Sequence, residues 1–549
     1  MKEKVINVLT KATKLNKKEI ANLIEIPPSS DLGDFAFPCF ILSKKQKKNP
    51  SKIASDLAKK ISSKDFEKVE SKGPYVNFFL DYKSTAKKIL SQIKKEKDKY
   101  GSSNIGKGKK ALVEHTSINP NASPHVGRVR NALIGDSIVQ ILKFQGFKVD
   151  TRYFVNDMGK QIALLVLGSR KKKNLKFKDL LDLYVKASKD LQKNKALEED
   201  VFKLLEKLEK GDSKTKKEFN WVVNICVKGQ IEILSKIGIK YDHFDYESEY
   251  LWSKKVQNVL TKLKKTGKTF LDQGRIVLNQ EKYNLPLKSP VLVLTRADKT
   301  SLYPLRDMAY TIDKMKMNKD NNIIVLGEDQ KTYFQQLKAA LDSLGIKSPK
   351  PIFYSFILLA DGKMSTRKGH VVLFEDFLKE ATQKAKSELK KRKEKDLKRA
   401  PLIANAATRY SILKISPSRN VIFNLSSALS TEGDTGPYLL YTYARARSIL
   451  RKAKSKKNYK IDTLDSSEKN LISQLVNFQN VVSASYTRLS PNLLANYSYQ
   501  LSRSFNEFYH ASKVLGSEKE QFRLALVSAF SQVLKNSLHL LGIETIERM

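Results

Sequence analysis

Three stretches of the chain differ in how apolar and polar residues alternate. Residues 1–108 mix helical and strand patterns: an amphipathic helix opens them, residues 50–61 have helical spacing, and residues 75–80 have the pattern of a strand. From residue 111, short apolar segments alternate with longer helical runs, as in a parallel α/β sheet. From about residue 379 almost all of the pattern is that of amphipathic helices. The chain is therefore predicted to have a small α/β domain, a larger α/β domain and an all-α domain.

The boundaries of these domains follow from composition. Residues 100–110 are rich in glycine, lysine and serine, as in a linker, so we expect the first domain to cover residues 1–108. The second is expected over residues 109–400 and the third over residues 401–549. Within the second, residues from about 161 to 278 become helical and lysine-rich. This stretch interrupts the strand–helix alternation, and we expect it to be a helical insertion in the sheet.

The first candidate for chemistry lies where an expected strand gives way to a helix. After the apolar strand at residues 111–113 comes a loop rich in proline, asparagine and serine, and then a helical run of apolar residues. His125, Gly127 and Arg128 stand in the loop that opens this helix. Free backbone N–H groups and the positive end of the helix dipole bind anions at such a place. A histidine, an arginine and a glycine that admits close backbone contact suit a triphosphate.

A second basic segment follows 238 residues later (363 − 125), at residues 362–369, with the sequence Gly-Lys-Met-Ser-Thr-Arg-Lys-Gly. A basic loop bounded by glycines can close over phosphates. Residues 125–128 resemble the HIGH motif of class I aminoacyl-tRNA synthetases, and residues 362–369 resemble their KMSKS loop in the form found in arginyl-tRNA synthetases. The resemblance implies a Rossmann-like catalytic domain. It assigns catalysis to His125, Arg128, Lys363, Ser365 and Lys368, and ATP binding to His125, Gly127, Arg128, Gly327, Asp329, Lys363 and Met364.

Two positions depart from the family pattern. Arg128 stands at the last histidine of the HIGH motif, and Thr366 stands at the second lysine of the KMSKS loop. Relatives without that lysine often carry one just upstream of the HIGH motif, but Ala122 and Ser123 occupy that place here. The cation that neutralises the phosphates therefore stays open between Arg128, Lys363 and Lys368.

The net charge points to a polyanionic partner. The 102 basic and 57 acidic residues give a charge of +45, which supports nucleic-acid binding without specifying it. Cys39 and Cys226 form no Cys-x-x-Cys pair, so we expect neither structural zinc nor a disulfide framework, and a cytoplasmic location is favoured. The first 20 residues lack the apolar core of a signal peptide, and no stretch is long enough to span a bilayer.

An amino-acid site for arginine needs carboxylates on rigid supports, because two carboxylate oxygens match the planar fork of a guanidinium. Glu247 is the least certain guanidinium partner, and Gln330 stands at a strand-to-helix switch, where open α/β sheets bind ligands. The resemblance implies that the arginine site is lined by Glu114, Ser117, Asn119, Glu247, Tyr303, Asp307 and Gln330.

The C-terminal region resembles the DALR-like anticodon-binding bundle of the same family, above all at residues 433–447, which begin Gly-Asp-Thr-Gly-Pro-Tyr. Aromatic side chains among basic ones can stack on unpaired bases. For Phe505 and Phe508 we expect burial in the helix core instead. The N-terminal domain resembles the part of the family that contacts the tRNA elbow. The resemblance implies tRNA contacts by Tyr75, Asn77, Asn506, Tyr509 and Met549.

The resemblance spans the whole chain and implies arginine–tRNA ligase activity. Arginine and ATP would form arginyl-adenylate and pyrophosphate, and arginine would then pass to the 3′ end of tRNA(Arg). The arginine carboxylate is the attacking group, so the protein supplies positioning and charge stabilisation. Mg²⁺ is expected to arrive with ATP, since no local carboxylate cluster suggests a protein metal site. The other partners are arginine and tRNA(Arg), and the protein is expected to be a monomer without membrane contact.

Two alternatives remain, a related enzyme and a protein of another functional class. A class I synthetase for another amino acid, or a related nucleotidyltransferase, is disfavoured by the acidic pocket residues and by the lack of zinc-binding cysteines. A catalytically silent tRNA-binding paralogue is expected to have lost His125 or the Gly-Lys-Met-Ser segment, and both are present.

Overall fold

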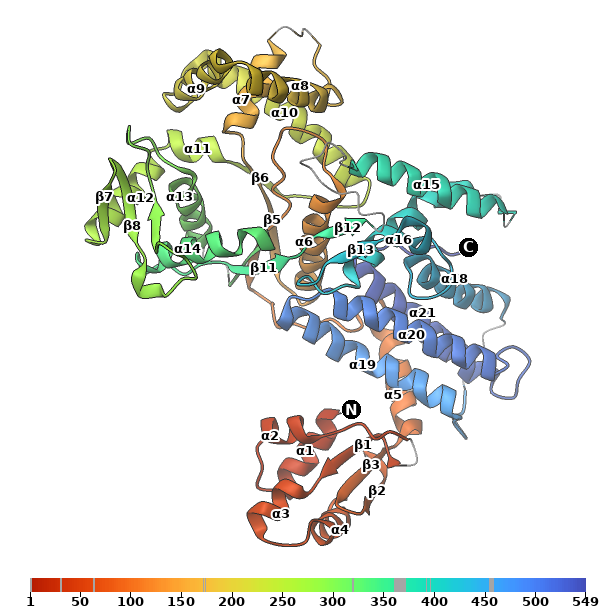
Figure 1. Cartoon of the computed structure of the whole chain (residues 1–549). Helices are drawn as coiled ribbons and strands as arrows, with labels where there is room; N and C mark the ends of the chain where they lie inside the picture. Colours follow the sequence, from red (N-terminus) through yellow and green to blue (C-terminus); the bar gives the residue numbers. More distant parts are fainter. Residues whose placement is uncertain are drawn as a thin grey trace.

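The computed structural model describes residues 2–549 except 30–31, 63–64, 171, 173, 318–319, 360–371, 392, 395 and 454–458. The N-terminal domain, the central sheet with its insertions and the C-terminal helices occupy distinct parts of the molecule (Figure 1). One large hydrophobic core runs through all three parts, and two further cores lie in and beside the insertions. The predicted fold class is confirmed.

An antiparallel sheet in the order β1-β3-β2 and four helices form the N-terminal domain. Val76, Phe78 and Leu80 alternate along β3 and are buried in the core, as the period of a strand requires. Asn49 accepts a hydrogen bond from the backbone N–H of Ser51 (2.8 Å) and thereby starts the proline-led helix α4. The elements are α1 (Lys2–Ala12), α2 (Lys17–Leu23), β1 (Phe35–Pro38), α3 (Phe40–Gln46), α4 (Pro50–Lys60), β2 (Phe66–Lys72) and β3 (Tyr75–Leu80).

Helix α5 (Tyr82–Glu96) and the short η2 (Lys97–Lys99) connect this domain to the rest of the chain and lie against the C-terminal helices. Tyr100 is fully buried: its hydroxyl donates to the carbonyl of Leu475 (2.8 Å), and its ring stacks on Phe478 with 6.0 Å between centroids. The linker predicted at residues 100–110 therefore begins with a residue packed firmly against the C-terminal region.

The central sheet has five parallel strands in the order β11-β10-β4-β5-β6. Ala111, Leu112 and Val113 of the middle strand are fully buried, because helices and loops cover both faces. All carboxyl ends lie at one edge, where residues that follow different strands meet. The elements are β4 (Lys110–Glu114), α6 (Val126–Phe144), β5 (Lys148–Val155), β6 (His243–Tyr246), α13 (Tyr303–Lys316), β10 (Asn321–Gly327), η4 (Glu328–Gln330), α14 (Lys331–Asp342) and β11 (Lys350–Tyr354).

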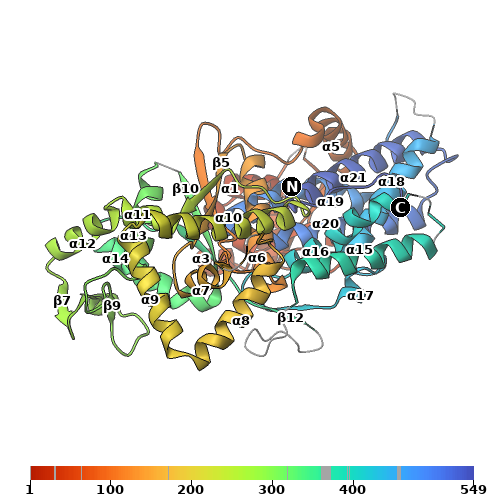
Figure 2. The ribbon, with the colours of Figure 1, turned by 90° about the horizontal axis from the view of Figure 1, so that it is seen from above.

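The insertion predicted at about residues 161–278 is divided in two and is not wholly helical. Four helices come first, and α8 and α9 extend to one side of the molecule as a V (Figure 2): α7 (Lys160–Ser169), α8 (Asp179–Lys193), α9 (Lys195–Glu209) and α10 (Ser213–Ser235). The chain then returns to the sheet as β6. The second unit follows, with α11 (Glu247–Trp252), α12 (Lys255–Lys265), β7 (Thr269–Asp272), β8 (Arg275–Asn279), η3 (Glu281–Tyr283) and β9 (Val291–Val293). Strand β6 was missed because no residue of this edge strand is fully buried, so it lacks an apolar run.

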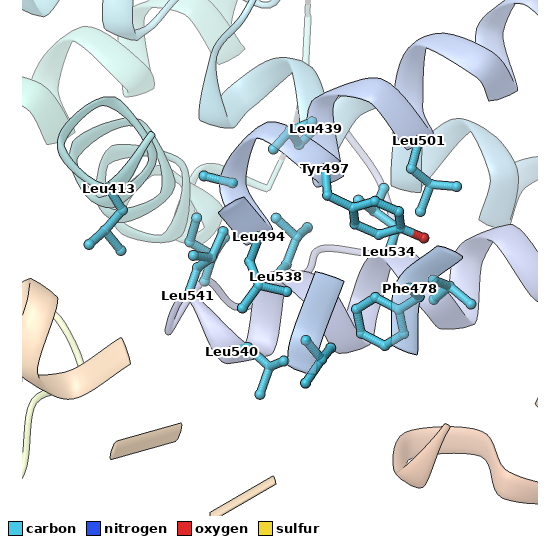
Figure 3. Packing of buried hydrophobic residues seen from close by; sticks show 14 of the residues in the cluster. Leu413, Leu439, Phe478, Leu494, Tyr497, Leu501, Leu534, Leu538, Leu540 and Leu541 are labelled. Atoms are coloured by element: carbon cyan, nitrogen blue, oxygen red, sulfur yellow. The ribbon is translucent and has the colours of Figure 1, made fainter. Parts of the chain in front are cut away.

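The C-terminal region is helical, as predicted, apart from β13, which pairs in parallel with β12. Side chains from α18, α19, α20 and α21 converge on one interior (Figure 3). Gly436 lets α18 approach α16, because a Cβ there would collide with the carbonyl of Ala406. The elements are β12 (Ile357–Leu359), α15 (Phe374–Lys391), η6 (Leu397–Arg399), α16 (Ala400–Leu413), β13 (Val421–Phe423), α17 (Leu425–Ala428), α18 (Gly436–Lys452), α19 (Ser466–Arg488), α20 (Asn492–Ala511) and α21 (Glu520–Leu540).

A buried ion pair joins the central domain to the C-terminal helices. Arg409 of α16 pairs with Asp136 of α6 (2.8 Å) and also donates to the carbonyls of Ile237 (2.6 Å) and Leu541 (2.9 Å). These acceptors compensate the cost of burying the guanidinium. Helix α6 is thus fixed to the segment after α10, to α16 and to the end of α21.

Candidate active site

Helix α6 begins at the carboxyl edge of the central sheet, and His125 is the residue before its first turn. Its neighbours pair with residues that follow the second basic segment. The backbone N–H of Val126 donates to the carbonyl of Val372 (3.2 Å), and that of Phe374 donates to the carbonyl of Pro124 (2.8 Å). The fold therefore brings the chain that leaves the second segment to the start of the first.

The second segment itself lies outside the described residues, and with it the predicted site residues Lys363, Met364, Ser365 and Lys368. Both of its described flanks lie beside α6. Strand β12 precedes the segment and contacts α6, and the bridge to His125 is made by Leu373 on the other side. The described flanks of the second motif thus lie beside the start of α6, although the two motifs are 238 residues apart in sequence.

The electrostatics at the start of α6 depend on Arg128. Burial lowers the pKa of His125 to about 4, and the positive charge of Arg128 acts in the same direction. The imidazole is therefore neutral at pH 7 and can bind an anion by a hydrogen bond without adding a charge. Arg128 is exposed in the first turn. The positive potential at this helix end comes from Arg128 together with the helix dipole.

Two buried side chains of α6 hold the strand ends in place around this start. The Arg130 guanidinium donates to the carbonyls of Ser355 (2.5 Å) and Ser416 (2.9 Å). The Asn131 side chain accepts from the backbone N–H of Thr116 (2.6 Å) and donates to the carbonyl of Val325 (2.8 Å). The helix start is therefore fixed to the ends of β4, β10 and β11.

The loop after β4 presents the predicted residues Ser117 and Asn119. Thr116 and Ser117 have left-handed backbone angles (φ 78° and 43°), which cost energy for residues other than glycine. Gln230 of α10 supports the loop by donating to the carbonyls of Asn119 (3.1 Å) and Ala122 (2.9 Å). The strain is thus held in place by the insertion, and Asn119 remains exposed at the sheet edge.

Tyr303, Asp307 and Lys314 follow helical spacing along α13 and meet the carboxylates of Glu114 and Glu247 at this edge, a cluster of side chains that we call the acidic pocket. Glu114, at the end of β4, forms a buried ion pair with Lys314. Glu247, at the start of α11, forms a buried ion pair with Arg306. In the orientation that satisfies its side-chain amide, Asn156 also donates to Glu247 (2.9 Å). Two of the predicted carboxylates therefore already have a cation of the protein as partner.

Asp307 is the third carboxylate, and it differs from the other two. Its Oδ2 accepts a hydrogen bond from the Tyr333 hydroxyl (2.6 Å), and no ion pair reaches it from any described residue. Burial raises the pKa of Asp307 to about 7, helped by the negative charges of Glu247 and Glu114. Of the three predicted carboxylates, Glu114 and Glu247 have a cation as partner and Asp307 has none among the described residues; a further buried carboxylate, Asp157, also interacts with Glu247.

The remaining predicted residues lie around the end of β10. A Cβ at Gly327 would collide with the Asp329 carboxylate unless that side chain moved. Asp329 and Gln330 are exposed in η4, and Tyr303 is 52% exposed with its ring 4.9 Å from that of Tyr333 between centroids. These groups therefore border the pocket from the solvent side.

Comparison with known proteins bears directly on this site. The family model described as "tRNA synthetases class I (R), catalytic domain" matches residues 89–424, and the models "Arginyl tRNA synthetase N terminal domain" and "DALR anticodon binding domain" match residues 1–80 and 439–549. The arginine–tRNA ligase of Methanocaldococcus jannaschii is 37% identical, and that of Clostridium acetobutylicum 34% identical, each with 100% of both chains covered. The chain belongs to the arginyl-tRNA synthetase family.

Solved structures agree with this membership. The arginyl-tRNA synthetase of Thermus thermophilus has a TM-score of 0.84 and 26% identity, and all of both chains is covered. The enzyme of Plasmodium falciparum has a TM-score of 0.81 at 22% identity, which supports the fold alone. The N-terminal domain, class I catalytic domain and DALR domain of an arginyl-tRNA synthetase are thus all present in this chain.

The DALR domain of this synthetase carries a polar and aromatic cluster between α18 and α20. The Arg445 guanidinium lies 4.9 Å from the ring centroid of Tyr441 and 5.1 Å from that of Tyr509. Asn506 accepts from Arg445 (2.7 Å) and donates to the Tyr438 hydroxyl (2.8 Å). Tyr509 is 39% exposed, so its ring is available to a base. Phe505 and Phe508 are fully buried, which confirms that they belong to the helix core.

The other predicted tRNA contacts differ in exposure. Tyr75 is half-buried and meets the exposed Phe40 edge-on (5.9 Å between centroids), whereas Asn77 is only 3% exposed. Met549 is half-buried beside the C-terminal helices. Tyr75 and Phe40 therefore form the more accessible part of the N-terminal surface.

The described part of the chain contains neither a side-chain cluster suited to a metal ion nor a helix suited to crossing a membrane. Its histidine, cysteine and acidic side chains form no group of three or more that could hold a metal ion. None of its helices is both long and apolar enough to cross a membrane. Cys39 and Cys226 are free and buried, and burial raises the pKa of both thiols.

Three residues of the acidic pocket were not predicted from the sequence: Arg306, Lys314 and Tyr333. A signal for each was present. Arg306 is adjacent to Asp307, Lys314 lies seven residues beyond Asp307 and so on the same helical face, and Tyr333 follows Gln330 by three residues. None of these spacings indicates which carboxylate pairs with Arg306 or with Lys314, because the pairing depends on how the strands and α13 pack.

Proposed function

We propose that this arginyl-tRNA synthetase activates arginine with ATP and transfers it to the 3′ end of tRNA(Arg). The single observation that carries the proposal is the Asp307 carboxylate, half-buried near two other carboxylates and without an ion pair among the described residues. A guanidinium supplies the missing charge and can bind a carboxylate through two N–H groups. Glu247, Tyr303 and Gln330 surround the guanidinium end, and Glu114, Ser117 and Asn119 line the site at the end of β4.

ATP is proposed to lie across the start of α6. His125, Gly127 and Arg128 receive its phosphates, and Gly327 and Asp329 border its nucleoside. The family resemblance adds Lys363, Met364, Ser365 and Lys368, which lie outside the described residues in a segment whose flanks are beside α6. An oxygen of the arginine carboxylate attacks the α-phosphorus, and the bond to pyrophosphate breaks. A hydroxyl of the terminal tRNA nucleotide then attacks the arginyl carbonyl and AMP leaves. The side chains position the reactants and stabilise charge.

The tRNA is proposed to contact the two ends of the chain. Asn506, Tyr509 and Met549 would face the anticodon, supported by the cluster around Arg445, and Tyr75 and Asn77 would face the elbow. The net charge of +45 attracts the phosphates of tRNA, and salt weakens this attraction at longer distances.

Three further proposals accompany this function: Mg²⁺ bound to ATP, a monomer and a cytoplasmic location. The free, buried cysteines support a reducing compartment. Analytical ultracentrifugation tests the monomer, and dependence of activation on added Mg²⁺ tests the metal.

The decisive experiment is ATP–pyrophosphate exchange with each of the twenty amino acids, with and without tRNA. Exchange that requires arginine supports the proposal. Exchange with a different amino acid would identify another specificity, and tRNA binding without any exchange would identify a silent paralogue.

A further inference from the structure

Tyr333, in the first turn of α14, directs its hydroxyl at the carboxylate of Asp307. The distance from the hydroxyl to Oδ2 is 2.6 Å. The ring packs 4.9 Å from Tyr303 between centroids, so the side chain is held between two elements of the pocket. Among the described residues, this is the one hydrogen bond made to the Asp307 side chain.

We propose that Tyr333 is a positioning residue for arginine: its hydroxyl fixes one oxygen of the Asp307 carboxylate and stabilises the charged form that holds the guanidinium. The inference rests on the proposed function, because it concerns the same pocket. It adds a residue that acts through Asp307, and it explains how a carboxylate surrounded by other carboxylates stays available to a cation.

The groups that face Asp307 come from four elements. Glu247 of α11 and Glu114 of β4 disfavour its negative charge, whereas Arg306 of α13 and Tyr333 of α14 favour it; Tyr303 of α13 is the fifth neighbour. Arg306 is engaged by Glu247 and by the carbonyl of Ser301 (3.1 Å), and Lys314 is engaged by Glu114. Tyr333 is therefore the neighbour whose hydrogen-bond donor is committed to Asp307.

The role has a consequence for the pH dependence of arginine binding. The pKa of Asp307 is about 7 in the free protein, and the guanidinium binds the ionised form. Below pH 7 the carboxylate must lose a proton on binding, so arginine affinity falls as the pH falls through about 7. Loss of the Tyr333 hydroxyl raises this pKa further and shifts the fall in affinity to higher pH.

The test is calorimetric titration of the full chain with arginine between about pH 6 and pH 8.5, in two buffers that differ in protonation heat. The parent should release most of one proton on binding below pH 7. Tyr333→Phe should bind roughly tenfold more weakly near pH 7 and approach the parent at the alkaline end, which corresponds to the loss of one charged hydrogen bond. Tyr333→His, which keeps a donor, should recover part of the affinity.

Two controls define the result. Tyr283→Phe removes an exposed hydrogen bond from a tyrosine hydroxyl to Asp342 (3.0 Å) at the other end of α14. Its arginine affinity should equal that of the parent at each pH. In an Asp307→Asn background, Tyr333→Phe should have no further effect. A loss by the same factor at every pH, or curves that superimpose on the parent, would overturn the role of Tyr333. A parent chain that binds no arginine at any pH would instead refute the proposed function.

Discussion

The acidic pocket and the helices of the DALR domain differ in how their charged side chains are paired. In the pocket, Glu114 and Glu247 are paired with cations inside the fold, and a single carboxylate is left over. On the helices, Arg445 lies over the rings of Tyr441 and Tyr509 near solvent. The whole chain has a net charge of +45. A site that water reaches poorly discriminates by single charges, because water cannot replace a lost partner. An exposed, basic surface binds by the sum of many small contacts.

Replacement of Asp307 by asparagine gives the largest effect expected from this contrast. Asp307→Asn removes the unpaired negative charge and leaves a buried guanidinium without its carboxylate, which costs about 3–5 kcal/mol, on the order of hundreds- to thousands-fold. Arginine KM in ATP–pyrophosphate exchange should rise by that factor, and discrimination against the uncharged analogue citrulline should shrink.

Asp313→Asn is the matched control, since Asp313 lies on the same helix but pairs with Lys255 at the surface (2.6 Å). It should behave as the parent does. An Asp307→Asn enzyme with parental arginine KM would show that this carboxylate does not read the substrate.

His125→Ala tests the catalytic side of the same sheet edge. In the proposed function, the neutral His125 donates to the ATP phosphates in the transition state. Its loss should then raise the barrier to adenylate formation by about 2.7–4 kcal/mol, which is roughly 100- to 1,000-fold in rate. Binding of tRNA should change little, because the proposed role concerns ATP. Single-turnover activation and tRNA filter binding measure the two effects, with the exposed His539→Ala as control. Undiminished activation would move the ATP site elsewhere.

The limits of sequence reasoning follow the same division between local and long-range features. The strands around residues 75–80 and 111–113 and the start of α6 were predictable, because period, glycine and proline are local signals. Strand β6 was not, since its residues are half-buried or exposed at the edge of the sheet. The pocket carboxylates came from motif resemblance, whereas their partners Lys314 and Arg306 emerged only from packing between distant elements. Ion pairing across 200 residues, as between Glu114 and Lys314, leaves no periodic trace.

Tyr509→Ala tests the proposed tRNA-binding surface, where a smaller effect on binding affinity is expected. Stacking of one base on an aromatic ring contributes about 1–3 kcal/mol, so tRNA binding should weaken by roughly five- to 150-fold while arginine affinity stays unchanged. Tyr509→Phe keeps the ring over which Arg445 lies and should retain most of the binding. Filter binding at fixed salt checks both variants. Unaltered tRNA affinity in Tyr509→Ala would make this ring an ordinary surface side chain.

Thr435→Ala gives the smallest effect and shows whether the two regions are energetically separate. The Thr435 hydroxyl caps α18 by accepting from the backbone N–H of Tyr438 (3.2 Å) and donates to the carbonyl of Ser430 (2.5 Å). Loss of such a cap costs about 1 kcal/mol of helix stability, and Thr435→Ser should restore it. Because α18 carries Arg445 but no residue of the acidic pocket, the free energy of unfolding should fall while arginine KM remains parental. Denaturant titration and exchange kinetics on the same preparation measure both quantities. A change in arginine KM without loss of stability would show that the acidic pocket is coupled energetically to the helices of the DALR domain, which contact α6 through the Arg409–Asp136 pair among other interactions.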